Sequence, residues 1–188
     1  MKTRKQNPKR RLNRSDRFYA ETGVNVKPLS AKLILSALSF ILIISPANAD
    51  PLDSPCRQTG IPKILVQAII KQESSGHPWA VNIGGRSYHP QNKKEALALI
   101  RKHNARSFDL GLMQVNSQWL RKFNLSPDLA IEPAVNVRLG IWILAQAILQ
   151  HGFNWKAVGA YHSPSPHRQR LYAQKIARHL HKLKKEKS

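Results

Sequence analysis

The feature that most constrains the fold is a long apolar segment at residues 133–150. Pro133 stands where a helix can begin, because the first helical turn does not need the N–H that proline lacks. Apolar residues then recur at helical spacing, at Val137, Ile141, Leu144, Ala145 and Ile148. Trp142 and Leu149 extend the apolar surface to other sides. A helix that is apolar on most sides must be surrounded by protein, so we predict a central buried helix that ends at Gly152.

Shorter segments predict the elements that cover this helix. Four further helices are expected. The first has apolar residues from Ile61 to Ile69 and runs to Glu73, and the second is capped by Asn92 and Glu95. The third is capped by Asn154 and continues through Tyr161, and the fourth is a basic amphipathic helix whose apolar side is formed by Tyr172, Ile176, Leu180 and Leu183. A short helix is expected through Trp119 and Leu120. Residues 80–88 predict a β-hairpin around Gly84 and Gly85, the only convincing β signal. We expect an irregular lead-in at residues 50–60 and a Pro-bounded loop around Asp128 and Glu132. The predicted class is mainly α with a small hairpin.

The N-terminal region has the pattern of an export signal. Residues 1–32 are strongly basic, and residues 33–44 form an uncharged apolar run. This run is shorter than the roughly 20 residues that span a bilayer as a helix. Ala47, Asn48 and Ala49 form an A-x-A cleavage pattern. We predict a signal peptide with a long basic n-region at residues 1–49 and one exported, periplasmic domain at residues 50–188. A retained membrane anchor is the alternative, which would leave the domain membrane-associated.

The charge of the chain narrows the class of partner. Its 31 Lys and Arg residues against 10 Asp and Glu residues give a formal charge of +21. A basic exported domain suits an anionic partner such as cell-wall polymer, a membrane surface or nucleic acid, and composition does not choose among them. Cys56 is the only cysteine, so no disulfide can form within the chain.

The available chemistry is acid–base catalysis by carboxylates. The sequence has no H-E-x-x-H zinc motif, no cysteine cluster and no G-x-S-x-G nucleophile motif, so we predict no metal and no cofactor. Among the carboxylates after residue 49, Glu73 and Asp109 are the ones not explained by chain ends, caps or loops. A carboxyl group at the end of a buried helix is partly desolvated, which raises its pKa as a general acid near neutral pH requires. A single Glu in a helix is nevertheless more often an ordinary solvated residue.

Four motifs that follow one another along the chain favour a functional role for Glu73. They are Glu73-Ser74-Ser75-Gly76, Pro78-Trp79-Ala80-Val81-Asn82, Gly111-Leu112-Met113-Gln114-Val115-Asn116 and Ala160-Tyr161. This order and spacing resembles the soluble lytic transglycosylase domain, which is related to goose-type lysozyme. The resemblance covers nearly all of the predicted domain and implies a lysozyme-like, mainly helical fold. It is nearest to the small enzymes that open peptidoglycan for conjugation, type IV and type III secretion machines.

The resemblance also implies a role for each matching residue. Glu73 matches the catalytic acid, which protonates the bond between N-acetylmuramic acid and N-acetylglucosamine and then acts as base to form a 1,6-anhydro end. Ser74 matches a residue that helps to hold the sugar, and Met113, Gln114 and Asn116 match the loop that lines the sugar subsites. Tyr161 matches a tyrosine that hydrogen-bonds the catalytic carboxyl.

The sequence departs from this family at a few places. Ser75 and His77 stand where relatives often have Gly and Asn, and His162 stands where the family usually has Asn. Ala134 stands where many relatives have a cysteine. The resemblance implies that those relatives could pair it with a cysteine near the position of Cys56.

Two alternative functions remain open at this point. A hydrolysing muramidase could use Asp109 as a second carboxylate to activate water, although the role we favour for Asp109 is to orient the loop before Gly111. A non-catalytic basic module could bind cell wall or nucleic acid through the C-terminal helix, although the predicted export disfavours nucleic acid. The partners that the resemblance implies are peptidoglycan glycan strands and components of a secretion or conjugation machine.

Overall fold

The structure, a computed structural model, describes residues 50–186. The predicted signal peptide at residues 1–49 lies outside this range. Within the range, none of the helices combines the length and the hydropathy that a membrane span requires.

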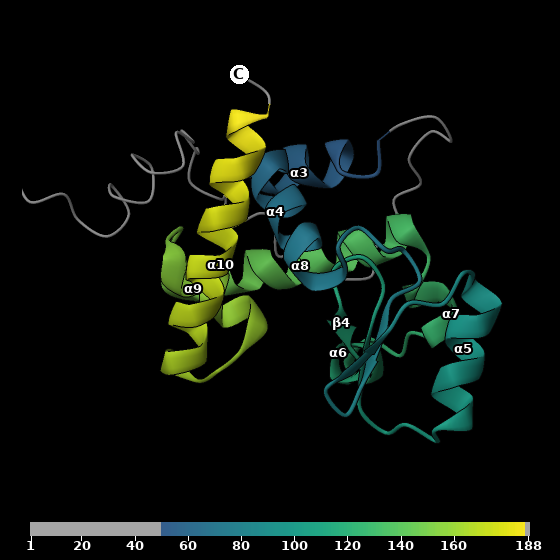
Figure 1. Cartoon of the computed structure of the whole chain (residues 1–188). Helices are drawn as coiled ribbons and strands as arrows, with labels where there is room; N and C mark the ends of the chain where they lie inside the picture. Colours follow the sequence, from purple (N-terminus) through teal and green to yellow (C-terminus); the bar gives the residue numbers. More distant parts are fainter. Residues whose placement is uncertain (1–49, 187–188) are drawn as a thin grey trace, which may run out of the picture.

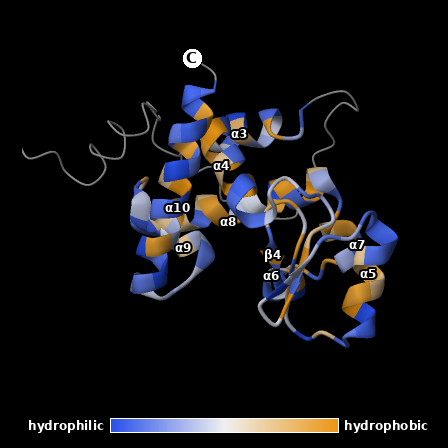
Figure 2. Ribbon diagram, viewed as in Figure 1, coloured by the Kyte–Doolittle hydropathy of each residue, from blue (hydrophilic) through white to orange (hydrophobic). Residues whose placement is uncertain are grey.

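The central helix predicted from the apolar segment is confirmed. Helix α8, Pro133–His151, is followed by Gly152, and its residues Leu139, Ile141 and Leu144 are fully buried. Figure 2 shows hydrophobic residues along α8 and hydrophilic residues over much of the C-terminal helix. The helices that surround α8 on one side of the molecule are α3, Asp53–Thr59; α4, Lys63–Ser74; α9, Trp155–His162; and α10, Pro166–Lys185. Helix α10 lies against both α9 and α4, so the first and last parts of the domain meet (Figure 1).

The other side of the molecule is built on a small antiparallel sheet (Figure 1). Its strands are β1, Val81–Ile83; β2, Arg86–Tyr88; β3, Phe108–Leu110; and β4, Val115–Asn116, in the order β2-β1-β3-β4. Helices α5, Lys93–Lys102; α6, Ser117–Lys122; and α7, Pro127–Ala130, lie on this side. The predicted hairpin is confirmed, with Val81 opposite Tyr88 and a turn whose Gly84 and Gly85 both have positive φ.

Three expectations about irregular segments were wrong. Residues 50–60 contain helix α3, which ends at Gly60 in the left-handed conformation. Asp128 lies in the short helix α7 rather than in a loop. The sheet has two more strands than the hairpin, because β3 pairs with β1 and β4 pairs with β3.

The helix caps follow the sequence closely. The Asn92 side chain accepts a hydrogen bond from the Glu95 N–H, so the predicted cap is confirmed. The Glu95 carboxylate accepts from the Asn92 side chain and from the Gln91 N–H, one residue before the backbone N–H that a capping box uses. The Asn154 side chain accepts hydrogen bonds from the first turn of α9. These caps fix where α5 and α9 begin.

Helix α8 also holds the loop between β3 and β4. Asn136 is fully buried; its Oδ1 accepts from the Met113 N–H, and its Nδ2 donates to the carbonyls of Leu110 and Ala130. The Met113 side chain is fully buried against α8 where Gly140 leaves room, since a Cβ at Gly140 would lie 2.4 Å from the Met113 sulfur. The loop at residues 111–114 is therefore fixed to the central helix on its inner side.

Candidate active site

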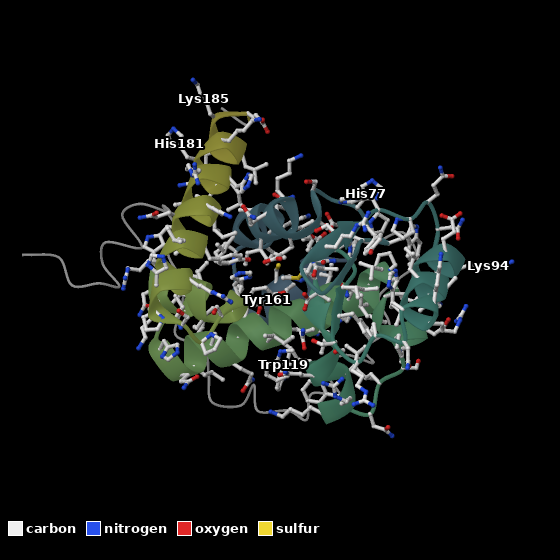
Figure 3. All side chains as sticks on the ribbon, turned by 60° about the horizontal axis from the view of Figure 1, so that its bottom comes forward. His77, Lys94, Trp119, Tyr161, His181 and Lys185 are labelled. Atoms are coloured by element: carbon white, nitrogen blue, oxygen red, sulfur yellow. The ribbon has the colours of Figure 1, made fainter. Side chains whose placement is uncertain are left out.

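A cleft of about 810 Å³ runs between the helical side and the sheet side of the molecule. The end of α4, the strands β1, β3 and β4, the helices α6, α8 and α9, and the start of α10 all contribute to its walls. Among its lining residues are most of the polar residues that the sequence predicts for a site: Glu73, Asp109, Gln114, Asn116 and Tyr161. Ser74 and Met113 are not among them. Figure 3 shows Tyr161 in the middle of the molecule and Trp119, another lining residue, on the sheet side.

Glu73 occupies the last turn of α4, where the helix meets the cleft. The helix ends because Ser75 takes the left-handed conformation, with φ of 54°, at its C-cap. The Glu73 side chain is only 13% exposed. This desolvation is the main cause that raises the pKa of the Glu73 carboxyl from 4.5 to about 7, and the negative charge of Asp109 adds to it. A large fraction of Glu73 is therefore protonated at neutral pH and able to donate a proton.

The tyrosine that hydrogen-bonds the Glu73 carboxyl is Tyr172 and not Tyr161. The Tyr172 hydroxyl of α10 donates to the Glu73 Oε1 at 2.5 Å, and this bond lowers the pKa of Glu73 against the effect of burial. The Tyr161 hydroxyl instead donates to the Met113 carbonyl at 2.7 Å. The role that the resemblance implied for Tyr161 was therefore wrong, and helical spacing had assigned Tyr172 only to the apolar side of its helix. A buried tyrosine hydroxyl needs a hydrogen-bond partner, but the sequence does not tell which group that partner is.

Ser74 and Met113 are buried beneath the wall of the cleft and hold its segments in place. Ser74 is 2% exposed; its hydroxyl donates to the Leu112 carbonyl at 2.8 Å and accepts from the Gly76 N–H at 3.2 Å. Met113 has no exposed surface. The prediction that these two side chains contact sugar was therefore wrong, because both are buried beneath the surface of the cleft. Ser74 joins the end of α4 to the loop at residues 111–114, and Met113 anchors that loop in the core.

Gln114 and Asn116 do lie on the cleft wall. Gln114 has a positive φ of 45°, and its Nε2 donates to the carbonyls of Ala80 and Gly111. The Asn116 Nδ2 donates to the Asp109 Oδ1 at 2.7 Å, while its Oδ1 caps α6. Both side chains are held by protein contacts, and their predicted contacts with sugar stay predictions.

Asp109 is the second carboxylate of the cleft. Burial raises the pKa of Asp109, while the hydrogen bond from Asn116 and the nearby His162 lower it. Its bond to Asn116 links β3 to β4 across the loop, which fits the orienting role that the sequence left open. Its negative charge also helps to keep Glu73 protonated.

His162, where the family usually has Asn, lines the cleft and lies beside Glu73, and its contact with Tyr172 was not predicted from the sequence. Its ring stacks on the Tyr172 ring with centroids 4.6 Å apart and planes 3° from parallel. Its Nδ1 lies 4.0 Å from the Glu73 Oε1. Burial is the main cause that lowers the pKa of His162, so the ring is mostly neutral at neutral pH. The ring therefore covers one side of the Tyr172–Glu73 hydrogen bond.

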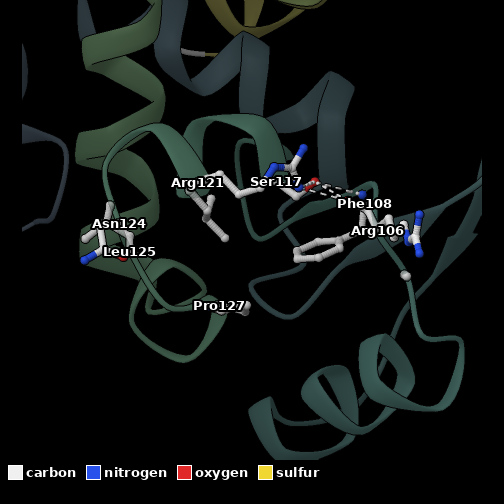
Figure 4. Close-up of a pocket in the computed structure, with 9 residues that line it drawn as sticks. Arg106, Phe108, Ser117, Arg121, Asn124, Leu125 and Pro127 are labelled. Atoms are coloured by element: carbon white, nitrogen blue, oxygen red, sulfur yellow. Dashed lines mark hydrogen bonds between the residues drawn. The ribbon is translucent and has the colours of Figure 1, made fainter.

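A second hollow of about 600 Å³ lies on the sheet side, between β3, α6 and the start of α7 (Figure 4). Its wall includes Arg106, Phe108, Ser117 and Arg121. None of the described residues that line it is a carboxylate. No group of three or more His, Cys, Asp or Glu side chains suited to a metal ion comes together within residues 50–186. The Glu73 cleft is therefore the candidate active site.

Removal of the Tyr172 hydroxyl tests the observed orientation of Glu73. In Tyr172→Phe the carboxylate loses a hydrogen bond that lowers its pKa, so the alkaline limb of the pH–rate profile should move to higher pH. The maximal rate of the expected glycan cleavage should fall roughly 10- to 100-fold, since hydrogen bonds to charged groups contribute about 1.5 to 3 kcal/mol. Tyr161→Phe is the matched control and should leave the alkaline limb in place. The same shift in both variants would contradict the assignment to Tyr172.

Comparison with known proteins identifies the family of the chain and several similar proteins. The family model described as the Transglycosylase SLT domain matches residues 52–179, a range that includes both Glu73 and Tyr172. The chain is 34% identical over 154 residues to Invasion protein IagB of Salmonella typhi, covering 77% of this chain and 84% of IagB. It is 30% identical over 156 residues to Protein IpgF of Shigella sonnei, covering 79% and 89% of the two chains. It is also similar to Protein virB1 of Agrobacterium fabrum, with 32% identity over 62% of this chain and 50% of virB1.

Proposed function

The chain belongs to the Transglycosylase SLT domain family and is a peptidoglycan lytic transglycosylase, and from this premise we propose that Glu73 serves it as both general acid and general base. The observation that carries the proposal is the Glu73 carboxyl itself. It is 13% exposed, it lines the cleft, it is held by Tyr172, and its pKa is about 7.

In the first step, protonated Glu73 gives its proton to the glycosidic oxygen between N-acetylmuramic acid and N-acetylglucosamine. The bond from C1 of the muramic acid to this oxygen breaks, and N-acetylglucosamine leaves with a hydroxyl group. Positive charge develops at C1 and the nearby ring oxygen, while Glu73 becomes a carboxylate. The bond from Tyr172 stabilises this carboxylate.

In the second step, the Glu73 carboxylate takes the proton of the muramic acid C6 hydroxyl. The C6 oxygen attacks C1, which closes the 1,6-anhydro ring and returns Glu73 to its protonated form. No water is consumed. An attacking group within the same sugar has a high effective concentration, so the reaction needs no second carboxylate to activate water.

The end groups of the products test this proposal. Purified protein is incubated with peptidoglycan, and the soluble fragments are analysed by mass spectrometry. We expect 1,6-anhydro-muramic ends, which are lighter than reducing ends by one water. Reducing ends would instead assign the protein as a hydrolysing muramidase, and no soluble fragments would assign it as a binding module.

The role of Asp109 separates the transglycosylase from the muramidase. We expect Asp109→Asn to keep its rate within about tenfold of the unchanged protein, because Asn still pairs with Asn116 and the C6 hydroxyl needs no further base. The alkaline limb of its pH–rate profile should move to lower pH, because the charge that raises the pKa of Glu73 is lost. A loss of about 10³-fold, measured by fragment release, would make Asp109 catalytic.

We also infer where the enzyme acts. The signal-like residues before Asp50 support export to the periplasm, where peptidoglycan lies. The similarity to a protein named Invasion protein IagB supports local opening of the wall for an envelope-spanning conjugation or secretion apparatus. Cell fractionation and the mass of the exported chain test this inference. An uncleaved chain in the membrane fraction would favour the retained anchor over a cleaved signal before Asp50.

A further inference from the structure

The surface of α10 carries a row of cations on one side. Arg168, Lys175, Arg178 and Lys182 are all exposed and follow one another at intervals of seven, three and four residues, which places them on one side of the helix. Leu171, which is 48% exposed, fills the gap between the first two. No Asp or Glu occurs from Pro166 to Lys185. We call these four basic residues and Leu171 the cationic stripe.

The stripe begins at the active site. Arg168 lines the cleft, and both Arg168 and Lys175 act electrostatically on His162. Lys175 also acts on Glu73, where its charge lowers the pKa. Arg178 and Lys182 act on His179, which contacts Gln72 of α4 one residue before Glu73. The stripe therefore runs from the cleft along α10 toward the end of the helix marked by His181 and Lys185 in Figure 3.

We propose that the cationic stripe binds the acidic peptide stem of the substrate, so that the enzyme prefers peptide-bearing glycan to bare glycan. This inference rests on the proposed function, since it needs the muramic acid to lie beside Glu73. Each muramic acid carries a peptide whose side chains and C-terminus hold free carboxylates. A stem attached at the cleft leaves it as an anionic chain, and the stripe is the row of cations that starts there.

The lengths of stem and stripe agree. A stem of four or five residues extends about 13 to 18 Å. Arg168 and Arg178 are ten helical positions apart, which is about 15 Å along the axis. Lys175 and Arg178 therefore lie within reach of an extended stem, whereas the last cations of α10 lie beyond it.

The size of the effect follows from the exposure of the stripe. Ion pairs at a protein surface contribute about 0.2 to 1 kcal/mol each and are weakened by salt. Two or three of them give a preference of roughly threefold to tenfold for peptide-bearing strands. The preference should fall as the salt concentration rises.

The experiment compares cleavage of two substrates by the full protein. One is intact peptidoglycan, and the other is the same glycan after an amidase has removed its stems. The measured quantity is the ratio of the two initial rates at one pH, in which any change in the acid strength of Glu73 cancels. The test variant is Lys175→Gln with Arg178→Gln. The matched control is Arg170→Gln with Lys184→Gln, which removes one exposed and one partly exposed cation from the opposite side of the same helix.

We expect a ratio of roughly three to ten for the unchanged protein and the control variant, and a ratio near one for the test variant. A ratio near one for the unchanged protein would overturn the inference while leaving the proposed function intact. An equal fall in the test and control variants would also overturn it, because net charge alone would then explain the preference. If neither substrate yields anhydro ends, the proposed function itself fails. Co-sedimentation with anionic phospholipid vesicles, lost only in the test variant and without a substrate preference, would reassign the stripe to a membrane surface.

Discussion

Glu73→Gln is expected to lower the rate of peptidoglycan cleavage by roughly 10² to 10⁴-fold or more. General acid–base catalysis contributes rate factors of this size, and in the proposed mechanism one carboxyl serves both steps. Glutamine keeps the shape of the side chain and can still accept the hydrogen bond from the Tyr172 hydroxyl. It has no proton to give to the glycosidic oxygen. The release of anhydro-muropeptides, followed by mass spectrometry, measures the loss.

The same substitution should make the protein more stable at alkaline pH. The pKa of Glu73 is raised from 4.5 to about 7 in the folded state, so the folded state binds this proton more tightly than the unfolded state. Between these two pH values the unfolded chain gains the free energy of ionisation while the folded chain does not, and stability falls as pH rises. The difference corresponds to roughly 3 kcal/mol above pH 7. Glutamine does not ionise and avoids this loss.

Two measurements separate these effects from unfolding. Denaturant unfolding of Glu73→Gln should match the unchanged protein near pH 4 and exceed its stability by about 2 to 3 kcal/mol at pH 8. Glu186→Gln, at an exposed position, is the control and should change neither activity nor the pH dependence of stability. A Glu73→Gln protein that still cleaves peptidoglycan would refute the assignment of Glu73.

Asn136→Ala is expected to lower the free energy of unfolding by roughly 3 to 5 kcal/mol. The Asn136 side chain satisfies three backbone groups, those of Met113, Leu110 and Ala130, in a fully buried position. Alanine would leave all three without this partner, and each unsatisfied buried group costs about 1 to 3 kcal/mol. The loop that carries Gln114 would also lose its attachment to α8.

Asn154→Ala provides the comparison for this prediction. Asn154 also donates to and accepts from backbone groups, but it does so at the start of α9, close to water. Loss of such a helix cap costs about 1 kcal/mol. Denaturant unfolding of the two variants measures both losses. Equal losses in the two variants would show that Asn136 acts only as a local hydrogen-bonding residue and not as the anchor of the loop.

Sequence periodicity predicted the long helices well, because their apolar faces pack on the core along many turns. The helix that ends beside Glu73, the central helix α8 and the amphipathic helix α10 are confirmed. The strands β3 and β4 were missed because they have three and two residues, too few to show an alternating pattern. They are stable as strands only because β3 lies against β1 in the folded domain.

Local sequence patterns predicted some residues of the candidate site but not the contacts that depend on how the helices pack. Glu73 could be recognised from its motif and from the end of its helix, and Gln114 and Asn116 line the cleft. The partner of Glu73 could not, because Tyr172 belongs by spacing to the buried face of α10. The direction of a hydroxyl depends on how α10 crosses α4, which no local pattern encodes. Met113 was placed on the wrong side of its loop because a family motif does not tell which side chains of the loop turn inward.

The hydrogen bond between Tyr172 and Glu73 joins residues that are 99 positions apart in the chain. A ribosome adds residues at about 5 to 20 per second, so roughly 5 to 20 seconds pass between the synthesis of the acid and that of its partner. During this time the acid has no oriented carboxyl. A chain truncated or cut by a protease ahead of Tyr172 stays in the same condition. Full competence to cut the wall thus arises only when the domain is complete.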